Sequence, residues 1–165
     1  MAFKAFRIKQ VDGAIEAGFE QLEINDLSAG EIVVRVQYSG INYKDALAAT
    51  GKGRITRVPA VNGGVDLVGV VDSSTDERFH GGDAVLVCGA VPSATLDGGS
   101  SEFARVPGAA AVPLPLGLTA RAAGAQGTAG VPAPRAKLTV GQKTQAHPFG
   151  PVVANRGPGG ARRCG

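Results

Sequence analysis

The sequence predicts a mainly β protein, an antiparallel partial barrel with two short helices. Two observations carry this prediction. Short runs in the first two thirds of the chain are rich in β-branched residues and alternate apolar with polar side chains. Turn signals separate these runs, as at Asp12-Gly13 and Ser28-Ala29-Gly30. Several short strands joined by Gly-containing turns favour a barrel, and 165 residues suffice for one domain with a core.

The expected elements follow the chain in order. Six strands are predicted, over residues 3–8, 15–22, 31–38, 66–71, 84–87 and 102–106. A first helix is expected over 44–49, because Asn42 suits an N-cap and Gly51 suits a helix stop. A second helix is expected over 119–125, with Thr119 as its cap. Residues 112–120 read as a linker, since two prolines spaced by one residue favour an extended path.

Charge is distributed unevenly along the chain. Residues 1–130 hold all 14 acidic residues and 11 Lys and Arg, a net charge of −3. Residues 131–165 hold six basic residues, no acidic residue, 5 Pro and 6 Gly. This composition is typical of disorder, and a basic tail can bind nucleic acid. The two parts therefore require separate accounts.

Several protein classes are disfavoured by composition. No run of about 18 apolar residues is present, so no transmembrane helix is expected, and the N-terminus does not resemble a signal peptide. Cys88 and Cys164 lie far apart in the sequence, which argues against a disulfide framework. A reducing cytoplasm is the predicted location.

Four segments in order carry a family resemblance: GINYKDALAATGKG (40–53), GGVDLVGVVDSSTDERFHGGDAVLV (63–87), GGSSEFARVP (98–107) and VPLPLGLTARAAGAQGTAG (112–130). Together they resemble the N-terminal, GroES-like half of medium-chain dehydrogenase/reductases, in the zinc-free branch of quinone oxidoreductases and acryloyl-CoA reductases. The resemblance covers about residues 2–130 and is weak over 89–97, the substrate-facing loop. It implies three regions: a GroES-like substrate-side domain (1–112), a linker and first helix toward a Rossmann domain (113–130), and a low-complexity tail (131–165).

The resemblance also bears on metal binding. On that matching, Asn42 stands where zinc-dependent relatives carry a cysteine, and Val65 where they carry a histidine. Neither side chain is a good Zn²⁺ ligand. His80, Asp83 and Cys88 match no usual zinc spacing. No metal site is expected.

Without zinc, the resemblance assigns other roles to this stretch. It implies that Asn42 and Tyr43 line the cleft beside an NADPH cofactor, that Thr128 approaches the cofactor, and that Asn42 and Asp45 are near the substrate. Tyr43 would be the catalytic donor to a developing negative charge. Structural interpretations stay open: Asn42 as a cap, Tyr43 as a half-buried aromatic, Asp45 as a loop anchor and Thr128 as part of a helix turn.

After Gly130 the resemblance implies a Gly-rich turn that binds the NADPH pyrophosphate, and this turn is missing from the sequence. Codons for residues 154–163, read one base later, permit that turn. Residues 131–165 are therefore interpreted as a frameshifted or disordered tail.

The leading functional hypothesis is a truncated, NADPH-dependent, zinc-independent reductase of an activated C=C bond, in an acryloyl-CoA-like thioester or a quinone. We expect it to be inactive as this fragment, so its status as an enzyme stays open. The alternatives are a non-catalytic GroES-like binding module and nucleic-acid binding through the tail, which lacks any recognised motif. The resemblance implies a small-molecule substrate, homodimeric intact relatives, and neither membrane nor nucleic acid as a partner.

Overall fold

A computed structural model describes residues 1–89 and 93–130 of the chain. The predictions for the tail, including its disorder and its frameshift, lie outside these residues. Within them, the prediction of a mainly β, GroES-like fold is confirmed.

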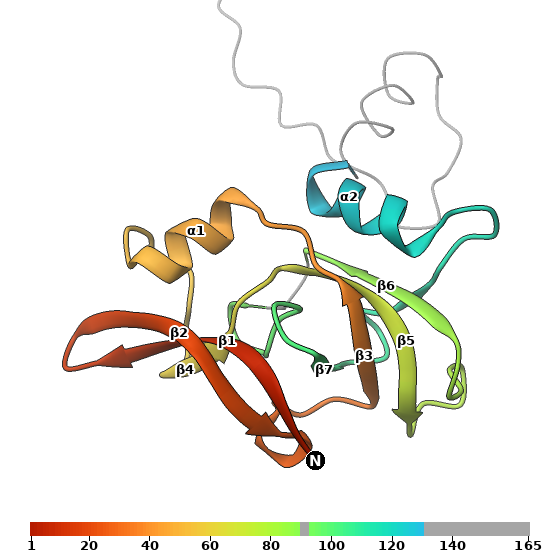
Figure 1. The fold of residues 1–165 in the computed structure, drawn as a ribbon, viewed down its shortest axis with the longest axis horizontal. Coiled ribbons are helices and arrows are strands. Elements are labelled where there is room, and N and C mark those ends of the chain that lie inside the picture. Colours follow the sequence, from red (N-terminus) through yellow and green to blue (C-terminus); the bar gives the residue numbers. More distant parts are fainter. Residues whose placement is uncertain (90–92, 131–165) are drawn as a thin grey trace, which may run out of the picture.

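Two antiparallel sheets form the barrel (Figure 1). The first has the strand order β2-β1-β4, with β1 (Ala2–Val11), β2 (Ala14–Glu23) and β4 (Ala60–Asn62). The second has the order β7-β3-β5-β6-β8, with β3 (Ile32–Tyr38), β5 (Asp66–Ser74), β6 (Ala84–Cys88), β7 (Phe103–Val106) and β8 (Val112–Pro113). A 3₁₀ turn, η1 (Ile24–Asp26), follows β2.

The two sheets meet where the segment before β7 runs along β1. The backbone N–H of Phe6 donates to the carbonyl of Ser100 at 2.8 Å, and that of Glu102 donates to the carbonyl of Lys4 at 3.0 Å. The main core lies in the five-stranded sheet and consists of Ile32, Val34, Leu67, Val71, Phe79, Val85, Val87, Ala104, Val106 and Ala111. Successive side chains of a strand point to opposite faces, so Ile32 and Val34 of β3 enter the core on one face of the sheet together with Val85 and Val87 of β6.

Two helices cap the barrel (Figure 1). Helix α1 (Tyr43–Thr50) begins after Asn42 and ends at Gly51, whose φ of 68° is left-handed and therefore favours glycine. Helix α2 (Ala120–Gly130) contacts β3, β5 and β6. The hydroxyl of Thr119 accepts a hydrogen bond from the backbone N–H of Ala122 at 3.2 Å, as the predicted cap requires.

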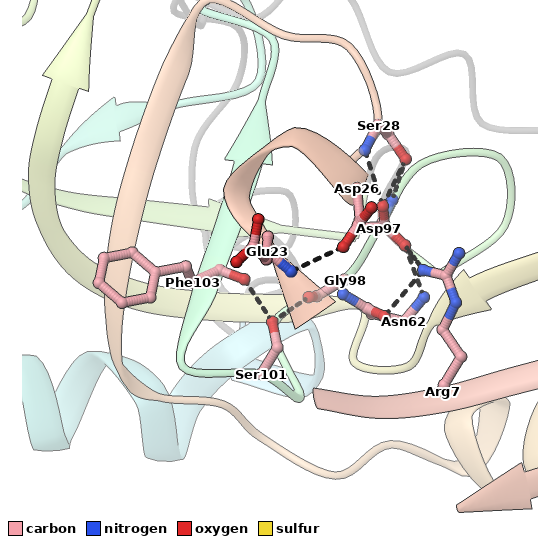
Figure 2. A network of polar contacts seen from close by, with 9 residues as sticks. All are labelled: Arg7, Glu23, Asp26, Ser28, Asn62, Asp97, Gly98, Ser101 and Phe103. Carbon is pink, nitrogen blue, oxygen red and sulfur yellow. Dashed lines mark hydrogen bonds and ion pairs between the residues drawn. The ribbon is translucent and has the colours of Figure 1, made fainter. Parts of the chain in front are cut away.

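A largely buried ion pair fixes the loop that leads from residue 93 toward β7 (Figure 2). Arg7 Nη1 lies 2.8 Å from Asp97 Oδ1 and 3.0 Å from Asn62 Oδ1. The other carboxylate oxygen of Asp97 accepts from both the backbone N–H and the hydroxyl of Ser28, each at 2.8 Å. Asp97 thus ties together β1, β4 and the segment after η1, and it anchors the end of the region whose family match is weak.

All six predicted strands and both predicted helices are present, with shifted ends. Strands β4 and β8 are additional. The segment 112–120 was predicted to be a linker, but its first two residues form β8, which pairs with β6 at the edge of the sheet. Pro113 fits there because an edge strand tolerates a missing N–H donor.

Candidate functional site

The candidate site is organised around a buried carboxylate at the start of β5. Asp66 is only 2% exposed, and no ion pair reaches it from the described residues. A buried carboxylate without a cation needs hydrogen-bond donors to replace water. Its surroundings supply them from two separate parts of the chain.

The donors come from Asn42, before α1, and from Thr128, near the end of α2. Asn42 Nδ2 donates to Asp66 Oδ2 at 2.9 Å, and the backbone N–H of Thr128 donates to the same oxygen at 2.7 Å. The hydroxyl of Thr128 donates to Asp66 Oδ1. Asp66 therefore links two residues that the family resemblance assigned to one site, although 86 positions separate them.

Tight packing of α2 makes these contacts possible. Gly127 has a φ of 41° and interrupts the helix, and a Cβ atom there would lie 2.5 Å from Asp66 Oδ2. At Gly124, a Cβ atom would lie 2.8 Å from the Cβ of Tyr38. Because only glycine fits these close approaches, Gly124 and Gly127 are what let Thr128 reach Asp66.

Asp45 holds the entry to α1 and does not point freely toward a ligand. Its Oδ2 accepts from the backbone N–H of Asn42 at 2.7 Å, as the third residue of a capping box does. Its Oδ1 accepts from the backbone N–H groups of Gly64 and Val65, at 3.2 and 3.1 Å. These bonds agree with the loop-anchor interpretation, while the predicted substrate contact of Asp45 stays a prediction.

Tyr43 is the first residue of α1 and lies at the surface. It is 78% exposed, and its hydroxyl forms no hydrogen bond with the described residues. A phenol hydroxyl can both donate and accept. The side chain is therefore available to a ligand, and it is more exposed than the half-buried alternative supposed.

Cys88 ends β6 directly opposite Asp66 in the β5–β6 ladder. Burial, followed by the charge of Asp66 and a hydrogen bond to it, raises the pKa of the Cys88 thiol to about 11. The thiol consequently stays protonated at neutral pH. Because nucleophilic attack needs the thiolate, Cys88 is a poor candidate for a nucleophile.

No cluster of three potential metal ligands occurs among residues 1–89 and 93–130. Zinc-dependent relatives were expected to carry metal ligands at the positions of Asn42 and Val65. In this structure the Asn42 amide donates a hydrogen bond to Asp66, and Val65 is apolar and only 6% exposed. Nor does any helix within the described part of the chain have the length and apolarity needed to cross a membrane.

The structure thus brings together Asn42, Asp45 and Thr128 through direct or shared hydrogen bonds, with Tyr43 exposed beside them. Sequence reasoning missed Asp66 as the centre. The available signal was an acidic residue opening the apolar run DLVGVV, where a strand buried on both faces has no place for an unpaired charge.

The barrel and this site define the class to which the protein belongs. The alcohol dehydrogenase GroES-like domain family matches residues 28–116, more than half of the chain, and the chain belongs to this family.

Individual relatives extend the match. The chain is 43% identical over 127 residues to the probable acrylyl-CoA reductase AcuI of Escherichia coli, which covers 77% of this chain and 39% of AcuI. It is 35% identical over 158 residues to the putative quinone oxidoreductase YhfP of Bacillus subtilis, covering 96% of this chain and 48% of YhfP. The described fold resembles the yhdH oxidoreductase of Salmonella enterica, solved with NADP, with 45% identity and a TM-score of 0.74, over 77% of this chain and 39% of that one. It also resembles B. subtilis yhfP, solved with NAD bound, with a TM-score of 0.78 over 87% of this chain and 44% of that one.

The chain spans less than half the length of each of these relatives. The YhfP match is longer than 130 residues, so it continues past Gly130 into the segment that the structure does not describe.

Proposed function

We propose that this chain forms the substrate side of an NADPH-dependent, zinc-independent reductase of an activated C=C bond, as in an acryloyl-CoA-like thioester or a quinone. The observation that carries the proposal is the pairing of an exposed donor, Tyr43, with a rigid polar wall built from Asn42, Asp66 and Thr128. The names of AcuI and YhfP supply the substrate classes.

Tyr43 is proposed as the catalytic donor. When hydride adds to the β-carbon of an acryloyl thioester, negative charge develops on the carbonyl oxygen. A hydroxyl already positioned at that oxygen lowers the barrier, because it stabilises charge that the substrate lacks before reaction. The α-carbon then takes a proton, either from Tyr43 or from water.

Asn42 and Thr128 are proposed to face the cofactor, and Asp66 to position them. A bound nicotinamide nucleotide supplies the hydride. The described residues suit only the nicotinamide end of such a cofactor, because residues 1–89 and 93–130 include no strand, Gly-rich turn and helix in succession that would bind its phosphates. We therefore propose that activity requires a nucleotide-binding half such as the one that follows this region in full-length family members. A preference for NADPH over NADH is part of the proposal. The yhdH relative solved with NADP supports this preference, whereas yhfP was solved with NAD bound.

A chimera tests the proposal. The segment of E. coli AcuI that matches this chain is replaced by residues 1–128, and NADPH oxidation is followed with acryloyl-CoA and with a quinone. We expect turnover of at least one substrate by the chimera and none by the chain alone. A folded chimera that binds NADPH but reduces neither substrate would exclude the proposed function, and turnover by the chain alone would exclude its proposed dependence on a second half.

A non-catalytic binding module is the second candidate, favoured by large apolar side chains at the surface. Ile41 is 92% exposed and Leu116 is fully exposed. Exposed apolar residues mark surfaces that associate when they form a contiguous patch. Light scattering tests this candidate: self-association of the chain that Ile41→Ser abolishes supports it, and a monomer at all concentrations excludes it. Homodimerisation, which the resemblance implies for intact family members, stays a prediction, as do a cytoplasmic location and the absence of nucleic-acid binding.

A further inference from the structure

A basic pocket lies beyond the C-terminal end of α1, outside the site described above. It has a volume of about 530 Å³ and is lined by Gln10, Arg54, Thr56, Arg57, Val58 and Pro59. Ligand pockets in proteins commonly fall between about 300 and 1,000 Å³. The lining combines two guanidinium groups, two neutral polar side chains and two apolar walls, which suits an anion carried on an organic group.

Among the described residues, no acidic group pairs with the arginines of this pocket. Residues 46–65 contain Lys52, Arg54 and Arg57 and no Asp or Glu. Neither arginine forms an ion pair with the described residues, and residues 90–92 and 131–165 contain no acidic side chain that could reach them. Arginine binds phosphate through two parallel hydrogen bonds, so two unpaired arginines in one pocket favour a phosphate-bearing ligand.

The loop that carries the arginines is held by its backbone. The N–H of Arg57 donates to the carbonyl of Ala94, and the N–H of Gln10 donates to the carbonyl of Pro59, both at 2.8 Å. These bonds fix the loop against β1 and the segment after residue 92. The guanidinium groups remain exposed, so they are free to contact a ligand.

Helix α1 lies between Tyr43 and the arginine-bearing loop along the chain. The eight residues of α1 span about 12 Å, Tyr43 is the first of them, and the lining residue Arg54 follows the last by four positions. The pantetheine arm of coenzyme A is longer than such a helix. A thioester at Tyr43 can therefore place its adenosine phosphates at Arg54 and Arg57.

We infer that this pocket binds the phosphate-bearing adenosine end of a coenzyme A thioester. The inference rests on the proposed function and narrows its substrate class, because a quinone has no group that would occupy the pocket. Arg54 and Arg57 then determine substrate specificity and take no part in the chemistry at the C=C bond.

Binding to the full chain tests the inference without NADPH or turnover. Isothermal titration calorimetry is performed with coenzyme A, 3′-dephospho-coenzyme A, pantetheine and inorganic pyrophosphate. We expect coenzyme A to bind more tightly than the other three ligands. In the double variant Arg54→Gln/Arg57→Gln, its affinity should fall about a hundredfold, about tenfold for each lost charge-assisted contact, while pantetheine binding should change less than twofold.

The control is Arg35→Gln/Arg121→Gln, which removes the same charge at two exposed positions outside the pocket. The inference is overturned if coenzyme A does not bind, if the control pair weakens binding as much as the pocket pair, or if pyrophosphate binds as tightly as coenzyme A. If coenzyme A binds but the chimera is inactive, the pocket assignment stands and the proposed function is excluded.

If the chimera is active but the pocket variant leaves its Km for acryloyl-CoA unchanged, the proposed function stands and the pocket assignment is excluded.

Discussion

Asn42 and Thr128 donate hydrogen bonds to the same oxygen of Asp66, at 2.9 and 2.7 Å. One residue precedes α1 in the barrel, and the other lies near the end of α2. The carboxylate between them therefore connects the barrel to the helix that the resemblance places at the start of the nucleotide-binding half.

Removing the charge of Asp66 should loosen this connection. Asp66→Asn replaces one acceptor oxygen by an amide that faces existing donors, so at least one buried group loses its partner. We expect the free energy of unfolding, measured by urea denaturation, to fall by about 1–3 kcal/mol. Asp72→Asn, on the exposed part of the same strand, should change it by less than about 0.5 kcal/mol. Equal effects of the two variants would show that Asp66 has no special role.

Gly127 should tolerate no side chain. In Gly127→Ala the new methyl group meets Asp66 Oδ2 while the backbone holds a left-handed φ of 41°. We expect a loss of about 1–3 kcal/mol. Gly18→Ala on β2 is the control, since a Cβ atom there has no neighbour within 4 Å and φ is ordinary. A stable Gly127→Ala protein with unchanged amide exchange at Thr128 would contradict this packing.

The ion pair of Arg7 and Asp97 should be costly to break from one side. The Asp97 side chain is 3% exposed and the Arg7 side chain 15%, so Asp97→Ala leaves a largely buried guanidinium without its carboxylate partner. We expect a loss of about 3–5 kcal/mol in urea denaturation. Lys9→Gln removes one partner of the more exposed pair of Lys9 with Glu20 and should cost less than about 1 kcal/mol. A similar small loss for Asp97→Ala would mean that water reaches the pair freely.

Cys88 should react slowly with thiol reagents below its pKa of about 11. In a Cys164→Ser background, the rate with a disulfide reagent should rise about tenfold per pH unit from pH 7 to 10, as the thiolate fraction grows. Asp66→Asn removes a cause of the raised pKa and should speed the reaction at pH 8. Protein unfolded in urea is the control, and an equal rate before and after unfolding would contradict the raised pKa.

The raised pKa of Cys88 also predicts how the free energy of unfolding depends on pH. The folded thiol holds its proton to a higher pH than the unfolded thiol, whose ordinary pKa is 9.0. The unfolded state therefore loses its proton first, and the contribution of Cys88 to stability should decline between about pH 9 and pH 11. Cys88→Ala should flatten this part of the stability profile.

Tyr43→Phe tests the proposed donor in the AcuI chimera. Loss of one hydrogen bond to a developing oxyanion should lower kcat about a hundredfold, while the Km for the substrate changes little. Because Tyr43 is 78% exposed in the described chain, its hydroxyl contributes little to folding, and urea denaturation should be unchanged. An unaltered kcat would assign the donor role to another group.

Local sequence features predicted most of this fold, because β-branched runs, turn residues and helix-capping residues mark strands and helices in the sequence. The β-branched residues in 31–38 predicted β3, and the pair of Asn42 and Gly51 predicted both ends of α1. Strands β4 and β8 were not predicted, because β4 has three residues and β8 two, too few to show a periodic pattern. Both pair with longer strands, β1 and β6.

The candidate site was predicted in part. Asn42 and Thr128 came from the family resemblance, and the structure joins them. Asp66 could not be found from local pattern, because its partners lie 24 and 62 positions away and its meaning depends on burial. The loop-anchor interpretation of Asp45, in contrast, followed from its place in the first turn of a helix.

The glycine packing of α2 also limits how this protein can vary over generations. Substitutions by large residues are tolerable at Arg121 and Gln126, which are exposed. At Gly124 and Gly127 any side chain would collide with a neighbouring residue. Homologous sequences that keep this packing should therefore retain glycine at the positions of Gly124 and Gly127, even where the other residues of α2 differ.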